Sequence, residues 1–122
     1  MKSLIIFGGF YCLAFAIFHL AFWRLFNWKT ELPKLNSINR GVLQVLNIRL
    51  TYVFFVVAFF CFFLTDELLG TVLGKFVLGA ISLFAVMRAF EQLIFWKVEK
   101  IGIMFFVIFL VGAGIFAVPI FF

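Results

Sequence analysis

Four long apolar runs limit this chain more strictly than any other feature of its sequence. They cover about residues 3–28, 38–65, 68–96 and 101–122. A helix rises 1.5 Å per residue, so roughly 20 residues cross about 30 Å of hydrocarbon. Lipid offers no partners for open backbone groups, and none of the four runs shows the alternation typical of a membrane β-strand. The runs therefore predict four transmembrane helices.

The composition excludes a soluble fold. The chain is 67% hydrophobic and 12% charged, with a mean hydropathy of +1.29, whereas soluble domains have about 45–50% apolar and about 25% charged residues. A chain of 122 residues also has too much surface for its volume to hide four apolar segments from water. Because short loops make neighbouring helices antiparallel, we expect an all-α membrane protein, a single up-down four-helix domain spanning residues 1–122.

Polar residues mark the connections between the runs. Residues 29–39 contain Pro33 and two candidates for a helix N-cap, Asn36 and Ser37. The acidic pair at 66–67 suits the start of the third helix, and residues 97–100 form a short charged turn.

The basic residues predict the orientation in the membrane. One face carries most of them, and the opposite face has only Lys2 and Lys75. The basic face comprises Arg24, Lys29, Lys34, Arg40, Arg49, Arg88, Lys97 and Lys100. Positive charge favours the cytoplasmic side, so we expect loops 29–39 and 97–100 in the cytoplasm and both termini outside, in a bacterial inner or plasma membrane. The net charge of +5 then reflects topology, and we expect no nucleic-acid partner.

Polar side chains recur at helical spacing near the start of the second run. They are Arg40, Gln44, Asn47 and Thr51, spaced by four, three and four residues. At about 100° per residue they fall on one narrow face of a helix, which we call the polar stripe. An unsatisfied polar group in hydrocarbon costs several kcal/mol, so the polar stripe must face protein, water or a ligand.

The first and third runs carry polar residues at the same expected depth, and we expect them to converge with the polar stripe beneath the inner leaflet. The predicted ligand-binding set is His19, Asn27, Arg40, Gln44, Asn47, Thr51, Arg88, Glu91 and Gln92. Glu91 is spaced to pair with Arg88 on its own helix. Arg40 would then lack an internal partner and could hold a phosphate or carboxylate.

Two interpretations of this set stay open. Polar groups at helix ends also reach headgroups or bond neighbouring helices without any ligand, so the set could be a purely structural network. His19, the only histidine, could relay a proton or bind a metal or haem. It could equally form a hydrogen bond with Asn47 or Gln44.

Other residues are assigned to the membrane interface and to helix packing. Trp23, Trp28 and Trp96 are expected to form an aromatic belt. Arg24 and Arg49 are expected to contact headgroups, with Arg49 pointing away from the polar stripe. Small residues that allow close helix approach are Gly70, Gly74, Gly112 and Gly114.

No motif for catalysis, phosphate loops or metal binding is present. Cys12 and Cys61 lie in apolar runs without metal-ligand spacing, and no metal or cofactor is predicted. We expect a non-enzymatic protein that binds or conducts a small anionic or amphiphilic ligand, such as a lipid headgroup. The alternative is a non-catalytic accessory subunit of a larger membrane complex. Expected partners are membrane lipids, a second copy of the chain or such a complex.

Overall fold

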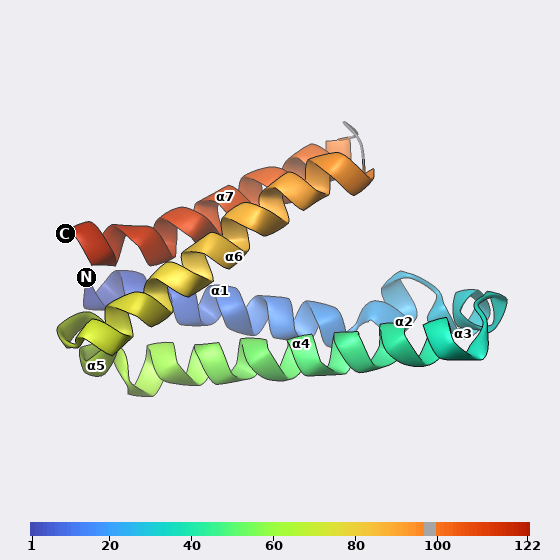
Figure 1. Ribbon diagram of the computed structural model, residues 1–122, viewed down its shortest axis with the longest axis horizontal. Coiled ribbons are helices and arrows are strands. Elements are labelled where there is room, and N and C mark those ends of the chain that lie inside the picture. The colour runs from blue at the N-terminus through green and yellow to red at the C-terminus, as the bar shows by residue number, and fades with distance from the viewer. Residues whose placement is uncertain (97–99) are drawn as a thin grey trace. The chain divides into compact units, whose positions relative to one another are not determined.

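The computed structural model describes residues 1–96 and 100–122, and this part of the chain is almost entirely helical (Figure 1). The elements are α1 (Lys2–Leu20), α2 (Phe22–Leu25), α3 (Trp28–Glu31), the 3-10 turn η1 (Leu32–Lys34), α4 (Ser37–Phe63), α5 (Thr65–Gly70), α6 (Val72–Trp96) and α7 (Lys100–Phe121). Helices α1, α4, α6 and α7 are long and apolar enough to cross a membrane. The predicted all-α membrane fold with four spanning helices is confirmed.

Backbone contacts divide the chain into two compact units. The hairpin unit comprises residues 1–8 and 60–122, and the stripe unit comprises residues 9–59. The single domain expected over residues 1–122 stays a prediction.

The first spanning helix ends earlier than its apolar run. The run predicted a helix over residues 3–28, but α1 ends at Leu20. The Ala21 amide donates to two carbonyls, those of Ile17 and Phe18, as the chain leaves the helix. Asn27 then adopts a left-handed conformation with φ 54° and ψ 47°, which asparagine tolerates better than most residues. The 19 residues of α1 extend about 28 Å, nearly the thickness of the hydrocarbon.

Helix α4 begins at a polar cap and is longer than a membrane requires. The side-chain oxygen of Asn36 accepts a hydrogen bond from the Asn39 amide at 2.8 Å, which confirms Asn36 as the N-cap. The 27 residues of α4 extend about 40 Å. Asn47 contacts the last turn of α1, and the turns of α4 that precede it extend past the end of α1 (Figure 1).

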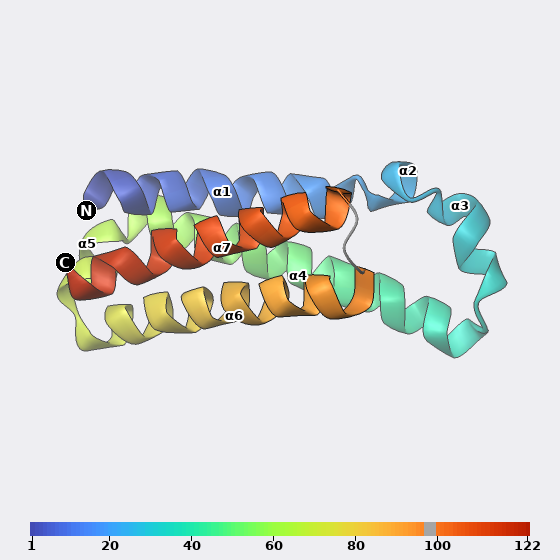
Figure 2. The ribbon, with the colours of Figure 1, turned by 90° about the horizontal axis from the view of Figure 1, so that it is seen from above.

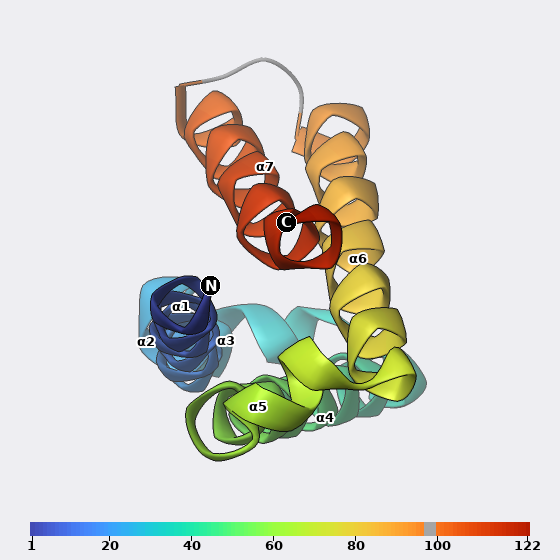
Figure 3. The same ribbon diagram turned by 90° about the vertical axis from the view of Figure 1, so that its left-hand side faces the viewer.

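The third predicted helix, 68–96, is divided at Thr71. Thr71 has extended backbone angles; its hydroxyl accepts from the Gly74 amide at 2.9 Å and donates to the Glu67 carbonyl at 2.7 Å. Thr71 is therefore the N-cap of α6. The expected acidic start lies in the first turn of the short helix α5 (Figure 3). There Asp66 pairs with Lys2 at 2.8 Å.

Helices α6 and α7 run side by side in opposite directions and form the core of the hairpin unit (Figure 2). The Ser82 hydroxyl donates to the Ala113 carbonyl across the two helices at 2.8 Å. Gly112, Ala113 and Phe116 are buried on α7. A Cβ on Gly8 would lie 2.9 Å from the Phe116 ring, so the start of α1 also approaches α7 closely. The charged turn expected at 97–100 lies, except for Lys100, outside the described residues.

Candidate functional site

Local hydrogen bonds hold most of the polar stripe in place. The Gln44 amide donates to the Arg40 carbonyl at 3.1 Å, and the Thr51 hydroxyl donates to the Asn47 carbonyl at 2.8 Å. Arg40 reaches back toward the N-terminus, where its Nη2 donates to the Leu35 carbonyl at 3.1 Å. Thr51 is buried, while Arg40, Gln44 and Asn47 are half-buried. The stripe is thus an ordered surface along one face of α4.

Asn47 joins the polar stripe to the end of α1. Its Nδ2 donates to the main-chain carbonyl of His19 at 3.0 Å. Carbonyls in the last turn of a helix have no partner within that helix, so Asn47 satisfies one of them at the point where α1 stops. The expected pairing of His19 with Asn47 is therefore formed, but through the backbone of His19 and not its ring.

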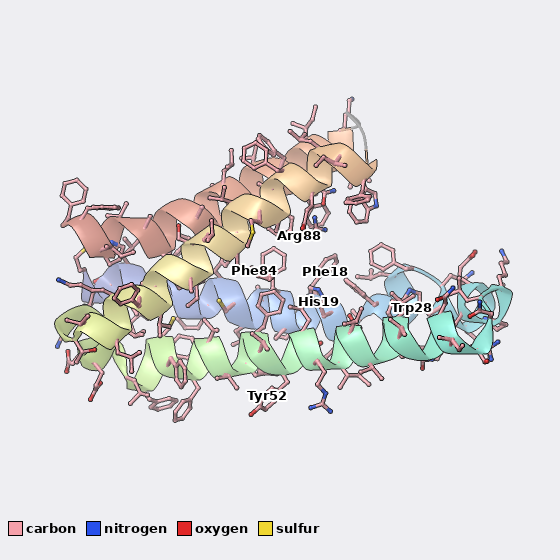
Figure 4. All side chains as sticks on the ribbon, in the orientation of Figure 1. Phe18, His19, Trp28, Tyr52, Phe84 and Arg88 are labelled. Carbon is pink, nitrogen blue, oxygen red and sulfur yellow. The ribbon has the colours of Figure 1, made fainter. Side chains whose placement is uncertain are left out.

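The imidazole of His19 lies in an aromatic cluster between α1 and α4 (Figure 4). Its Nδ1 is 2.8 Å from the Phe15 carbonyl; a carbonyl can only accept, so Nδ1 carries the proton. The ring stacks on Phe22 at 4.5 Å between centroids and lies 5.2 Å from Phe54. Tyr52, on the same helix as Phe54, points to the other side of α4 (Figure 4).

Two buried atoms of the polar stripe have no hydrogen-bond partner within the described chain. They are Nε of Arg40 and Oδ1 of Asn47. Leaving a buried donor or acceptor unpaired costs about 1–3 kcal/mol, and such groups in native proteins call for a specific explanation. One atom is a cationic donor and the other an acceptor, and the two residues are about 10 Å apart along the helix axis. These atoms are the strongest indication of a binding site in the stripe unit.

The remaining predicted residues of the stripe unit lie apart from the polar stripe. Asn27 is exposed, and its side-chain oxygen accepts a hydrogen bond from the Thr30 hydroxyl at 3.3 Å, so it shapes the corner before α3. Arg24 and Arg49 are exposed. Trp23 is also exposed. Trp28, expected in the same interfacial belt, is instead 7% exposed and packs 5.7 Å from the ring of Phe22.

The third-span residues belong to the hairpin unit. The guanidinium of Arg88 lies over two rings, 5.0 Å from the centroid of Trp96 and 4.8 Å from that of Phe109. Ion pairs within the described residues join Lys2 to Asp66 and Lys34 to Glu31, so the expected Arg88–Glu91 pair is not formed.

The other two predicted residues of the third span differ in their burial. Glu91 is exposed and Gln92 is buried. Both lie on α6 in the hairpin unit, whereas the polar stripe lies in the stripe unit. Convergence of the three spans stays a prediction.

The four packing glycines differ in their surroundings. A Cβ on Gly74 would overlap the backbone of Glu67 and Leu68, whereas one on Gly70 or Gly114 would meet nothing within 4 Å. Gly112 is buried in α7. Of these four glycines, Gly74 therefore permits a close approach, where α5 folds against α6.

Sequence reasoning missed two features of the hairpin unit. Phe109 is one of 22 phenylalanines, and no pattern singles it out as the ring beneath Arg88. The bond between Ser82 and Ala113 joins residues 31 positions apart. Only the pairing of α6 with α7, which short-loop topology favours, could have suggested either contact.

An apolar recess lies on α4 outside the polar stripe. It is lined by Ser37, Ile38, Gly41, Val42, Val45 and Leu46. The recess is shallow, and most of its side chains are exposed. It was not expected from the sequence.

Comparison of the chain with family models, with curated proteins and with solved structures finds no match. Functional inference therefore depends on the geometry of the two units.

Proposed function

We propose that this small integral membrane protein binds or conducts a small anionic or amphiphilic ligand, such as a lipid headgroup, at the polar stripe of α4. The observation that supports this proposal most is the buried Nε of Arg40, which has no partner in the described chain. We further propose that the stripe faces the cytoplasm, that both termini lie outside, and that the protein is not an enzyme.

The charge of Arg40 suits an anion. Its Nη2 is bonded to a neutral carbonyl, that of Leu35, and the described ion pairs do not include Arg40. An arginine presents a planar set of donors that matches the oxygens of a phosphate or carboxylate. A ligand oxygen at Nε would satisfy the donor and balance the charge in one contact.

The free oxygen of Asn47 adds a second requirement. Oδ1 is an acceptor, and its Nδ2 is already used by the His19 carbonyl. A ligand that reaches this atom needs a hydroxyl or amine donor. Amphiphiles with both an anionic group and a polar headgroup meet the requirements of Arg40 and Asn47 together.

Replacing Arg40 by alanine tests the proposal. We expect the preference of the protein for phosphatidylglycerol over phosphatidylcholine to fall about tenfold in Arg40→Ala. This is the effect of losing one charge-assisted hydrogen bond. The measurement is native mass spectrometry of protein released from nanodiscs containing both lipids. Lys75→Ala is the control, because it removes one positive charge from an exposed position on α6, outside the stripe unit. Equal retention by wild type and Arg40→Ala would contradict the proposal.

The alternative role as an accessory subunit is favoured by the apolar recess at Ser37–Leu46. A recess without charged side chains on an exposed helix face is suited to another apolar surface, supplied by a second copy or a larger complex. The same mass spectra discriminate the roles, because they report subunit number and bound lipid together. Spectra that show bound protein subunits but no preference for either lipid would favour the accessory role.

A further inference from the structure

Arg88 is a cation placed among aromatic side chains in a spanning helix. Its guanidinium carbon lies 5.0 Å from the ring centroid of Trp96 on α6 and 4.8 Å from that of Phe109 on α7. Phe109 is buried, whereas Trp96 is about half exposed. The guanidinium therefore contacts one ring in the core of the hairpin unit and one ring at its surface.

The two rings do not satisfy the hydrogen-bonding needs of this side chain. Aromatic faces attract the positive charge, but the N–H groups in the plane of the guanidinium need lone-pair acceptors. The Nη1 atom is buried and has no hydrogen-bond partner in the described chain. The side chain thus keeps an unused donor at a place where water is scarce.

Charge balance is also incomplete at this position. Glu91, three residues further along α6, is exposed and forms no ion pair with Arg88. Ionisable groups inside spanning segments are rare and usually mark a functional contact. Glu91 attracts Arg88 only from beyond ion-pair distance, so an anion from outside the hairpin unit would supply the acceptor that Nη1 lacks and a closer negative charge.

The level of the guanidinium along α6 identifies the class of anion. Arg88 lies eight residues before Trp96, the last residue of α6, or about 12 Å from the helix end. Long basic side chains near a helix end extend toward the interface, and tryptophan prefers the headgroup level. The contact with Trp96 therefore brings the guanidinium toward the level of lipid phosphates.

We propose that Arg88, Trp96 and Phe109 form a phosphate-binding clamp on the α6–α7 hairpin. The rings hold the guanidinium in place, and its in-plane donors bind the phosphate oxygens of a phospholipid in the adjacent leaflet. The clamp does not depend on the proposed role of Arg40, because every residue that carries it lies in the hairpin unit.

The test compares two lipids with the same acyl chains, phosphatidylglycerol and a galactosyl diacylglycerol that has no phosphate. Wild-type protein in nanodiscs of the equimolar mixture should retain the phospholipid preferentially in native mass spectra. Arg88→Ala should reduce this preference about tenfold. Lys75→Ala, at an exposed position of the same helix, should not change it. An unchanged preference in Arg88→Ala would overturn the clamp.

Two further variants test the geometry. Arg88→Lys keeps the charge but loses the planar donors, and Phe109→Leu keeps an apolar side chain but removes the buried ring. Both should lose part of the preference while their helical circular dichroism stays that of wild type. Wild-type selectivity in both variants would show that charge alone attracts the lipid, and would overturn the clamp.

Adding inorganic phosphate identifies the source of the phosphate. Displacement of the retained phospholipid would support a phosphate site open to free anions, and no displacement would support a lipid site. Arg40→Ala separates this inference from the proposed function, since it should leave the preference over the galactolipid in place. Loss of the preference in Arg40→Ala but not in Arg88→Ala would overturn the clamp and favour the polar stripe.

Discussion

Helices α4 and α7 are both spanning helices, yet they are held to their neighbours by different means. Helix α4 has a polar stripe near its N-terminal end, and Asn47 bonds the carbonyl of His19 at the end of α1. Helix α7 has no ionisable side chain from Ile101 to Phe122. It packs on α6 through small buried residues and accepts one hydrogen bond, from Ser82.

The difference shows where function can be sought in so apolar a chain. Helix association in lipid depends on close packing and on interhelical hydrogen bonds, because lipid gives little hydrophobic drive. At the α6–α7 contact, close packing, the hydrogen bond of Ser82 and the contact of Arg88 with the Phe109 ring join the two helices. Buried polar atoms that no contact within the described chain satisfies remain on α4, at Nε of Arg40 and Oδ1 of Asn47, and on α6, at Nη1 of Arg88, but not on α7. Such atoms, and not the number of polar residues, distinguish a candidate site from a packing device.

The largest expected effect of a small substitution concerns the packing in the hairpin unit. Gly74→Ala places a methyl group where the backbone of Glu67 and Leu68 already lies, so α5 must move. We expect a loss of about 1–3 kcal/mol, typical of overpacked positions. The measurement is the free energy of unfolding, obtained by titrating the protein with a denaturing detergent in mixed micelles.

Gly70→Ala is the matched control for this prediction, because a Cβ there meets nothing within 4 Å. Both substitutions change a glycine to an alanine, at positions four residues apart on either side of the helix break at Thr71. Equal stability of Gly74→Ala and Gly70→Ala would contradict the close approach of α5 to α6.

Smaller losses of stability are expected when one polar contact between helices is removed, either that of Asn47 on α4 or that of Ser82 on α6. Asn47→Leu leaves the His19 carbonyl without its donor but also removes the unpaired Oδ1, so we expect a net loss of about 1 kcal/mol. Ser82→Ala removes one bond between helices and should cost about 0.6 kcal/mol, the average for membrane helices. Both losses are measured by the same unfolding titration. A stabilised Asn47→Leu would show that the polar stripe is maintained for binding at a cost to stability.

The number and approximate positions of the spans could be predicted from the sequence, because length and apolarity determine which segments can cross lipid. The end of α1 could not be predicted. Phe22, Trp23 and Phe26 continue the apolar run past Leu20, so the pattern does not mark the point where α1 ends. The division at Thr71 was also missed. Threonine occurs within helices as well as at N-caps, so its presence alone does not predict a break.

The polar stripe was predictable from spacing alone, because four residues at helical intervals must share a face. The partners of those residues were less predictable. The sequence indicated Asn47 beside His19, but the structure uses the backbone carbonyl. Arg88 was expected to pair with Glu91 by its spacing, yet the aromatic rings of Trp96 and Phe109 compete for the guanidinium. Ring contacts between helices depend on packing, which a spacing rule does not contain.

The central claim is that the chain crosses the membrane four times and presents the start of α4 to the cytoplasm, and cysteine labelling tests it most directly. Ser37→Cys places a thiol at the exposed start of α4, and Glu67→Cys places one at an exposed position of α5, which follows the end of α4, while Cys12 and Cys61 are buried. A membrane-impermeant maleimide added to intact cells should label Glu67→Cys at once and Ser37→Cys only after permeabilisation. Labelling of Ser37→Cys in intact cells would contradict the claim.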